Sequence, residues 1–70
     1  MEKAYRFDDQ KPSVGSTVYA FRTLNGLKTF AKMQGSIGSQ KFWEIDGSIV
    51  SDDGSEDGIR IRVSSVRQVF

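Results

Sequence analysis

Carboxylates are the side chains of this chain that could carry acid–base or metal chemistry. Nine Asp and Glu residues occur among 70, whereas His and Cys are both absent from the sequence. The chain therefore has no Ser–His or Cys–His nucleophile, no His/Cys zinc site and no imidazole to act as a general base. An enzyme with this sequence would depend on carboxylates alone, so we expect a protein that is not an enzyme.

Glu44 and Asp46 are spaced as a pair of carboxylates that could share acid–base work. Asp46-Gly47 lies between two apolar segments, an arrangement that strongly predicts a two-residue hairpin turn. The turn would join a strand at 40–45 to a strand at 48–52. It would place both carboxylates at a loop instead of in a cleft, so we assign them no catalytic role.

The segment 52–58, Asp-Asp-Gly-Ser-Glu-Asp-Gly, gathers four carboxylates in one predicted turn. Calcium prefers six to eight oxygen ligands from a flexible loop, but the order of residues departs from the EF-hand pattern. We favour a solvated turn in which Gly54 and Gly58 supply backbone freedom. We therefore expect neither a metal site nor another cofactor, and calcium binding stays the alternative.

Two short aromatic echoes, Tyr5-x-Phe7 and Tyr19-x-Phe21, each place two rings on one face of a predicted strand. On adjacent strands the four rings could stack the bases of a single-stranded nucleic acid. However, the RNA-recognition signature is missing and the isoelectric point is only about 8.1. A domain this small needs such rings in its core, which is the interpretation we favour.

Charge is segregated along the chain. Residues 1–42 hold seven basic and three acidic side chains, residues 43–58 hold six acidic and no basic ones, and residues 59–70 hold three arginines. Opposed patches of this kind favour contact with another protein chain, either a second copy or an acidic partner. The residues expected to face that partner are Lys28, Lys32, Arg60 and Arg62.

The elements that must position these residues are mostly strands. Val and Ile greatly outnumber Leu, and the alternation of apolar residues predicts strands at 4–8, 17–23 and 59–63. Apolar residues on both faces of 17–23 indicate a central strand. The alternation after residue 63 breaks at Ser64-Ser65, where a bulge or tight turn would explain it.

One helix is predicted, at 25–34. Asn25 is a favourable N-cap and Gly35 a favourable residue after the end, while Leu27, Phe30 and Ala31 share one face. Lys28 and Lys32 would point away from that face.

Together these elements predict a single small α+β domain over residues 1–70. Its mostly antiparallel sheet would have four to six strands in the order β-β-α-β-β-β, with the helix packed on one face. The expected core consists of Val18, Tyr19, Phe21, Leu24, Leu27, Phe30, Ala31, Phe42, Trp43, Ile45, Val50, Ile59, Ile61 and Val63.

The functional expectation is a small non-enzymatic binding module that acts through protein–protein contacts, with a homo-oligomer as one form of that contact. A single-stranded nucleic-acid-binding domain using Tyr5, Phe7, Tyr19 and Phe21 is the alternative. The chain has no apolar run near the ~20 residues that span a bilayer and no secretory signal pattern at its start. We therefore expect a cytoplasmic protein that does not act at a membrane.

Overall fold

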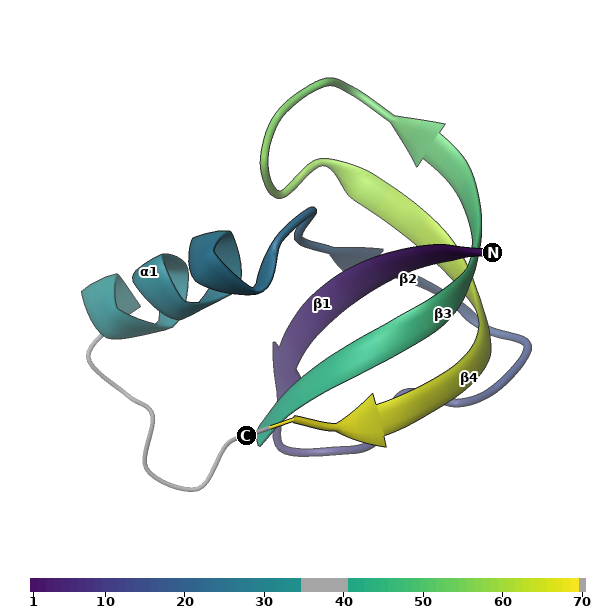
Figure 1. The fold of residues 1–70 in the computed structure, drawn as a ribbon, viewed down its shortest axis with the longest axis horizontal. Coiled ribbons are helices and arrows are strands. Elements are labelled where there is room, and N and C mark those ends of the chain that lie inside the picture. The colour runs from purple at the N-terminus through teal and green to yellow at the C-terminus, as the bar shows by residue number, and fades with distance from the viewer. Residues whose placement is uncertain (35–40, 70) are drawn as a thin grey trace.

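The computed structural model describes residues 1–34 and 41–69. Within them, four strands and one helix follow one another (Figure 1): β1 (Glu2–Asp8), β2 (Thr17–Ala20), α1 (Leu24–Gln34), β3 (Lys41–Asp52) and β4 (Ile59–Gln68). The predicted α+β class is confirmed, with the helix between the second and third strands. The order is β-β-α-β-β, because the two strands expected at 40–45 and 48–52 are one continuous strand.

The strands form one antiparallel sheet in the order β1-β3-β4-β2. The sheet curls so strongly that its first and last strands meet, as Figure 1 shows. Tyr5 and Phe21 join them with two backbone hydrogen bonds, of 2.9 and 2.7 Å. The expectation that 17–23 is a central strand is wrong, because β2 is the last strand of the sheet and ends at residue 20.

The expected hairpin at Asp46-Gly47 is also wrong. Asp46 pairs with Ser65 and Gly47 with Val63, so the register shifts by one residue and Ser64 is the extra residue on β4. This bulge explains the break in alternation near Ser64. The chain reverses instead in the acidic segment 53–58, because the long β4 strand pairs with β3 on both sides of the bulge.

Two apolar clusters hold the fold together. The first lies among the strands and consists of Ala4, Ala20, Ile45, Ile59, Ile61 and Val63, with Val18, Ile49 and Val66 partly buried against it. The second lies between the helix and the strands and consists of Leu27, Ala31 and Phe42, packed against Tyr5, Phe7, Phe21, Leu24 and Val69. The predicted alternation of buried Ile59, Ile61 and Val63 with exposed arginines is confirmed.

Three residues expected in the core lie at the surface. The exposed fraction is 63% for Tyr19, 53% for Val50 and 37% for Phe30. Ala4 and Ala20, which were not expected in the core, are almost fully buried. A four-stranded sheet that closes on itself encloses little space, so small side chains fit inside where larger ones do not.

The helix begins one residue earlier than expected. Its N-cap is Thr23, whose Oγ1 accepts a hydrogen bond from the Gly26 amide at 3.0 Å. Asn25, the expected cap, lies inside the first turn. Leu27 and Ala31 are fully buried on the face toward the strands.

Candidate functional site

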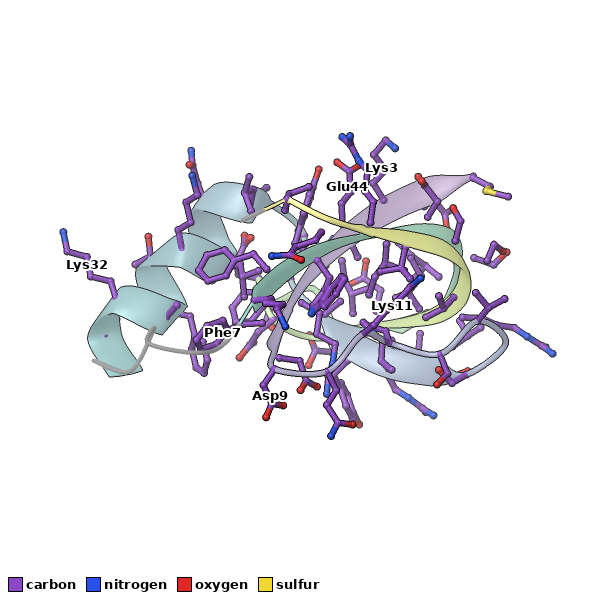
Figure 2. All side chains as sticks on the ribbon, turned by 90° about the horizontal axis from the view of Figure 1, so that it is seen from below. Lys3, Phe7, Asp9, Lys11, Lys32 and Glu44 are labelled. Atoms are coloured by element: carbon purple, nitrogen blue, oxygen red, sulfur yellow. The ribbon has the colours of Figure 1, made fainter. Side chains whose placement is uncertain are left out.

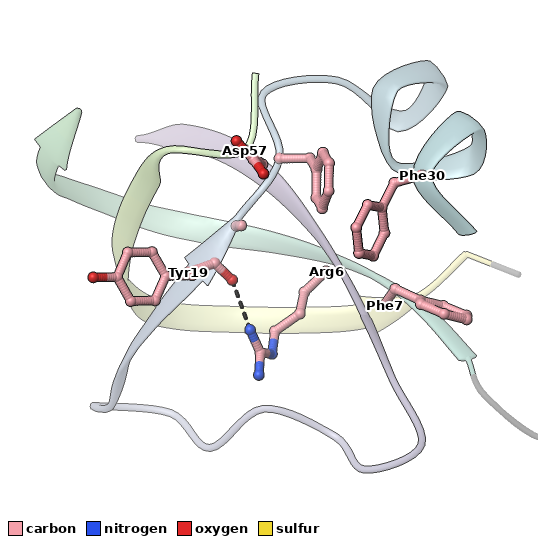
Figure 3. A pocket seen from close by; sticks show the side chains of 7 residues that line it. Arg6, Phe7, Tyr19, Phe30 and Asp57 are labelled. Carbon is pink, nitrogen blue, oxygen red and sulfur yellow. Dashed lines mark hydrogen bonds between the residues drawn. The ribbon is translucent and has the colours of Figure 1, made fainter. Parts of the chain in front are cut away.

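A pocket of about 340 Å³ opens where the helix meets the two joined strands (Figure 3). Its apolar wall comes from Phe7 of β1, Phe21 after β2 and Phe30 of α1. The Phe21 and Phe30 rings are in direct contact, with their centroids 5.1 Å apart. The complete lining is Arg6, Phe7, Tyr19, Ala20, Phe21, Phe30 and Asp57. We refer to it as the aromatic pocket.

The aromatic pocket lies beside the isolated bridge that joins β1 to the segment after β2 at Tyr5 and Phe21. The Arg6 side chain crosses from β1 to β2, and its Nη1 donates to the carbonyl oxygen of Tyr19 at 2.8 Å. Its Nη2 donates to a carboxylate oxygen of Asp8 at 3.2 Å. Arg6 therefore links β1 to β2 through a hydrogen bond and places its guanidinium beside the aromatic wall of the pocket (Figure 3).

An exposed apolar side chain follows Phe30 along the helix. Phe30 and Met33 are three residues apart, so they share one flank of α1. Met33 is 81% exposed, the most exposed large apolar side chain of the helix. We call Phe30, Met33 and the aromatic pocket together the apolar patch.

Tyr19 forms the border between the aromatic pocket and a second one. The guanidinium carbon of Arg60 lies 5.7 Å from the centre of the Tyr19 ring, a cation–π arrangement across the β2–β4 pair. The second pocket, of about 300 Å³, is lined by Tyr19, Ser51, Asp52, Asp53, Gly58 and Arg60. Carboxylates therefore lie beside the exposed ring.

The acidic turn is anchored on the segment before the helix. Arg22 pairs with Asp52 and donates from Nε to the carbonyl oxygen of Ser55 at 2.9 Å. Hydrogen bonds from the Gly54 amide and from Arg22 hold the pKa of Asp52 below its usual value. The hydroxyl and amide of Ser55 lower the pKa of Asp53 in the same way.

The described residues contain no cluster of carboxylates that would support the calcium-binding alternative. Nowhere in residues 1–34 and 41–69 do three or more Asp or Glu side chains converge as a cation would require. In the turn, the Asp52 carboxylate pairs with Arg22 and the Glu56 carboxylate accepts from Thr23.

Glu44 and Asp46 lie side by side on β3 and face cations instead of a turn. Glu44 accepts from Nε of Arg67 at 2.9 Å and from the Tyr5 hydroxyl at 3.3 Å. The Lys3 ammonium nitrogen Nζ lies 2.7 Å from Oδ1 of Asp46 and 3.6 Å from Oε1 of Glu44. Figure 2 shows Lys3 beside Glu44. The Arg67 hydrogen bond is the main cause that lowers the pKa of Glu44, and the Lys3 hydrogen bond is the main cause for Asp46.

The four aromatic side chains expected on one face are divided by the structure. Tyr5, Phe7 and Phe21 are half-buried against the helix cluster, and two of them, Phe7 and Phe21, line the aromatic pocket. Tyr19 is exposed on its own beside Arg60. The prediction that Tyr19 and Phe21 share one strand face is wrong, because β2 ends at Ala20 and Phe21 packs against the helix cluster while Tyr19 is exposed.

The four basic residues expected to face a partner lie on two elements. Lys28 and Lys32 are on α1, where Lys32 projects into solvent near the end of the helix (Figure 2), and Lys28 is half-buried. Arg60 and Arg62 are exposed on β4, and Arg60 lines the second pocket. Met33, which the sequence reasoning did not single out, is the neighbour of Lys32 along the helix.

Comparison with known protein families, with curated proteins and with solved structures finds no match for this chain. Among the described residues, no helix combines the length and apolar character that crossing a membrane requires.

Proposed function

We propose that this chain is a small non-enzymatic binding module whose partner is another protein chain. The observation that carries the proposal is the apolar patch, in which Phe30 lines the aromatic pocket and the exposed Met33 follows three residues later on α1. Contiguous exposed apolar groups with a charged rim are typical of interaction sites. Arg6 and Asp57 supply charges of opposite sign at the rim, which would orient a bound segment.

A carboxylate-based enzyme has less support. The pair Glu44 and Asp46 is held by Lys3 and Arg67, and the pKa of each carboxyl is lowered. A general acid working near neutral pH needs a raised pKa instead. Neither residue lines the two pockets described above.

The distribution of charge is consistent with a protein partner. The acidic turn carries Asp52, Asp53, Glu56 and Asp57, while the basic side chains proposed to contact an acidic surface are Lys28, Lys32, Arg60 and Arg62. A second copy of the chain would offer both signs. We propose that this contact takes place in the cytoplasm.

The test is capture from a lysate of the source cells with the tagged chain as bait, with and without nuclease. We expect bound protein that survives nuclease and is lost when the bait carries Met33→Lys. Val14→Lys is the matched control, because Val14 is also exposed, at 66%, but lies between β1 and β2 and not on α1. Capture that is equal for both variants would contradict the proposal.

A second candidate, binding of single-stranded nucleic acid, is favoured by the exposed Tyr19 ring and the Arg60 guanidinium over it. Bases stack on such rings, and arginines contact phosphates. The carboxylates of Asp52, Asp53 and Asp57 line the pockets on either side of Tyr19 and would repel a phosphate backbone. Bound material that disappears with nuclease would favour this candidate.

A further inference from the structure

The first turn of α1 brings together the two groups that react when an asparagine loses its amide. Asn25 is the only asparagine of the chain, and a glycine follows it. The backbone nitrogen of a residue can attack the side-chain amide of an asparagine before it, and glycine hinders this approach least because it has no Cβ atom. The Asn25 side chain is exposed, so water and base can reach its amide.

The Gly26 amide lies before the point at which main-chain hydrogen bonds hold the helix. The Leu27 amide donates to the carbonyl oxygen of Thr23 at 3.2 Å and closes the first turn. The Gly26 amide donates instead to the Thr23 hydroxyl at 3.0 Å. The first amides of a helix have no main-chain acceptor, and helix ends open more readily than helix interiors. Among the contacts described, one side chain therefore holds the nitrogen that would attack Asn25.

The acidic turn reinforces this cap and also requires glycine at position 26. The Glu56 carboxylate accepts from the Thr23 hydroxyl at 2.8 Å and from the Thr23 amide at 3.1 Å. The same carboxylate lies against Gly26, where an added Cβ atom would clash with it. The contact that joins the turn to the helix therefore keeps an unhindered glycine nitrogen next to Asn25.

We propose that Asn25 is a site of spontaneous deamidation whose rate is set by the Thr23 cap. While the cap is closed, the helical backbone keeps the Gly26 nitrogen away from the Asn25 side chain. When the first turn opens, the Gly26 nitrogen loses its proton to base and bonds to Cγ of Asn25. The Cγ–Nδ2 bond breaks, and Nδ2 takes up a proton and leaves as ammonia.

The ring that forms is a succinimide, and water opens it. Water adds to either of its two carbonyl carbons, and the bond from that carbon to the ring nitrogen breaks. The product is aspartate when the side-chain carbonyl is attacked and isoaspartate when the main-chain carbonyl is attacked. Water is the only co-reactant, and no electron is transferred.

The two products should affect the helix differently. The first turn of α1 holds no acidic residue, so an aspartate there interacts favourably with the positive end of the helix dipole. Isoaspartate adds a methylene group to the main chain, which moves the Gly26 amide away from the Thr23 hydroxyl. We expect the isoaspartate form to unfold at a lower urea concentration than the unmodified chain.

The test is incubation of the purified full chain in mildly alkaline buffer, followed by mass spectrometry and peptide mapping. We expect the mass gain of amide hydrolysis in the peptide that contains Asn25, and none there in Asn25→Ser. Thr23→Val, which removes the hydroxyl that holds Gly26, should raise the rate about 5- to 30-fold. Thr23→Ser, which retains the hydroxyl, should leave the rate within about twofold.

Ile61→Val separates opening of the first turn from unfolding of the whole chain. Ile61 is fully buried in the cluster among the strands and lies outside the helix cluster, so the substitution lowers stability without touching the cap. It should change the deamidation rate much less than Thr23→Val. Equal acceleration by both variants would overturn control by the cap. An Asn25 that stays unmodified in the folded chain while the urea-unfolded chain deamidates would overturn the site.

Discussion

The Glu56 carboxylate of the acidic turn is bonded to the residue that caps the helix. Its Oε2 accepts from the Thr23 amide at 3.1 Å and from the Thr23 hydroxyl at 2.8 Å. The same hydroxyl oxygen accepts from the Gly26 amide at 3.0 Å. The β3–β4 turn and the start of α1 are therefore one unit, and this unit sets the position of Asp57 at the rim of the aromatic pocket.

Replacement of Thr23 by Val should destabilise the protein by about 1–2 kcal/mol, because the helix loses its cap and Glu56 loses a hydrogen bond. Unfolding in urea measures the effect. Thr29→Val is the control, since Thr29 is exposed on the same helix and should change stability by no more than about 0.5 kcal/mol. Equal effects of the two variants would show that the bonds between turn and helix contribute nothing.

Gly47 should tolerate no side chain, because of its close approach to a neighbouring strand and not because it forms the hairpin turn that the sequence predicts. Its φ is not positive, but a Cβ atom there would clash with the backbone carbonyl of Arg62 on the neighbouring strand. Gly47→Ala should therefore cost about 1–3 kcal/mol or more, because backbone must move. A Cβ atom at Gly54 would meet open space, but the backbone φ there is 90°, which L side chains rarely adopt. Gly54→Ala should therefore lower the free energy of unfolding by about 1 kcal/mol.

Urea unfolding of the two variants, measured side by side, decides the point. A larger loss at Gly54 than at Gly47 would contradict the close approach of β3 and β4 at the bulge.

The sequence predicts those parts of the fold that depend on local periodicity. The alternation through Ile59, Ile61 and Val63 and the helical stripe of Leu27 and Ala31 each show which face is buried. The Asp46-Gly47 pair misleads because the turn preference of two residues is overridden by pairing along the whole of β4. Local propensity is a weak guide where long strands can pair on both sides of a glycine.

The candidate site was only partly predictable. The aromatic echoes identify Phe7 and Phe21, which line the pocket, but the sequence does not show that β2 ends at Ala20 and divides Tyr19 from Phe21. Phe30 was expected in the core, because its spacing from Leu27 places both on one helical stripe. Its exposure follows from its position at the edge of that stripe, which only the packing of α1 against the strands decides.

The stability of the folded chain should fall in acid. The carboxyls of Glu44, Asp46 and Asp52 all have a lowered pKa in the folded state. A carboxyl whose pKa is lowered by folding stabilises the folded state at pH values above its ordinary pKa. This stabilisation is lost as the pH falls through the pKa of the folded state. We therefore expect the free energy of unfolding to be nearly constant from about pH 7 to pH 5 and to decrease below about pH 4.

Arg67→Gln should reduce this acid dependence, because the Arg67 hydrogen bond is the first cause that lowers the pKa of Glu44. Arg62→Gln, which removes an exposed arginine from the same strand, is the matched control. Denaturant unfolding at a series of pH values measures both variants. A protein that becomes more stable as the pH falls from 5 to 3 would contradict the ion pairs around Glu44.

Substitution of Tyr19 distinguishes protein binding from nucleic-acid binding, because the Tyr19 ring is exposed and its loss should not affect folding. Tyr19→Ser removes the stacking surface, whereas Tyr19→Phe retains it. If the natural partner is a protein, both variants should show the same lack of binding to a labelled oligothymidylate at physiological salt, as measured by fluorescence anisotropy. The carboxylates of Asp53 and Asp57 beside the ring oppose a polyanion. An affinity that falls steeply with salt, survives Tyr19→Phe and disappears with Tyr19→Ser would instead favour a nucleic-acid-binding domain, with Arg60 and Arg62 as the phosphate contacts.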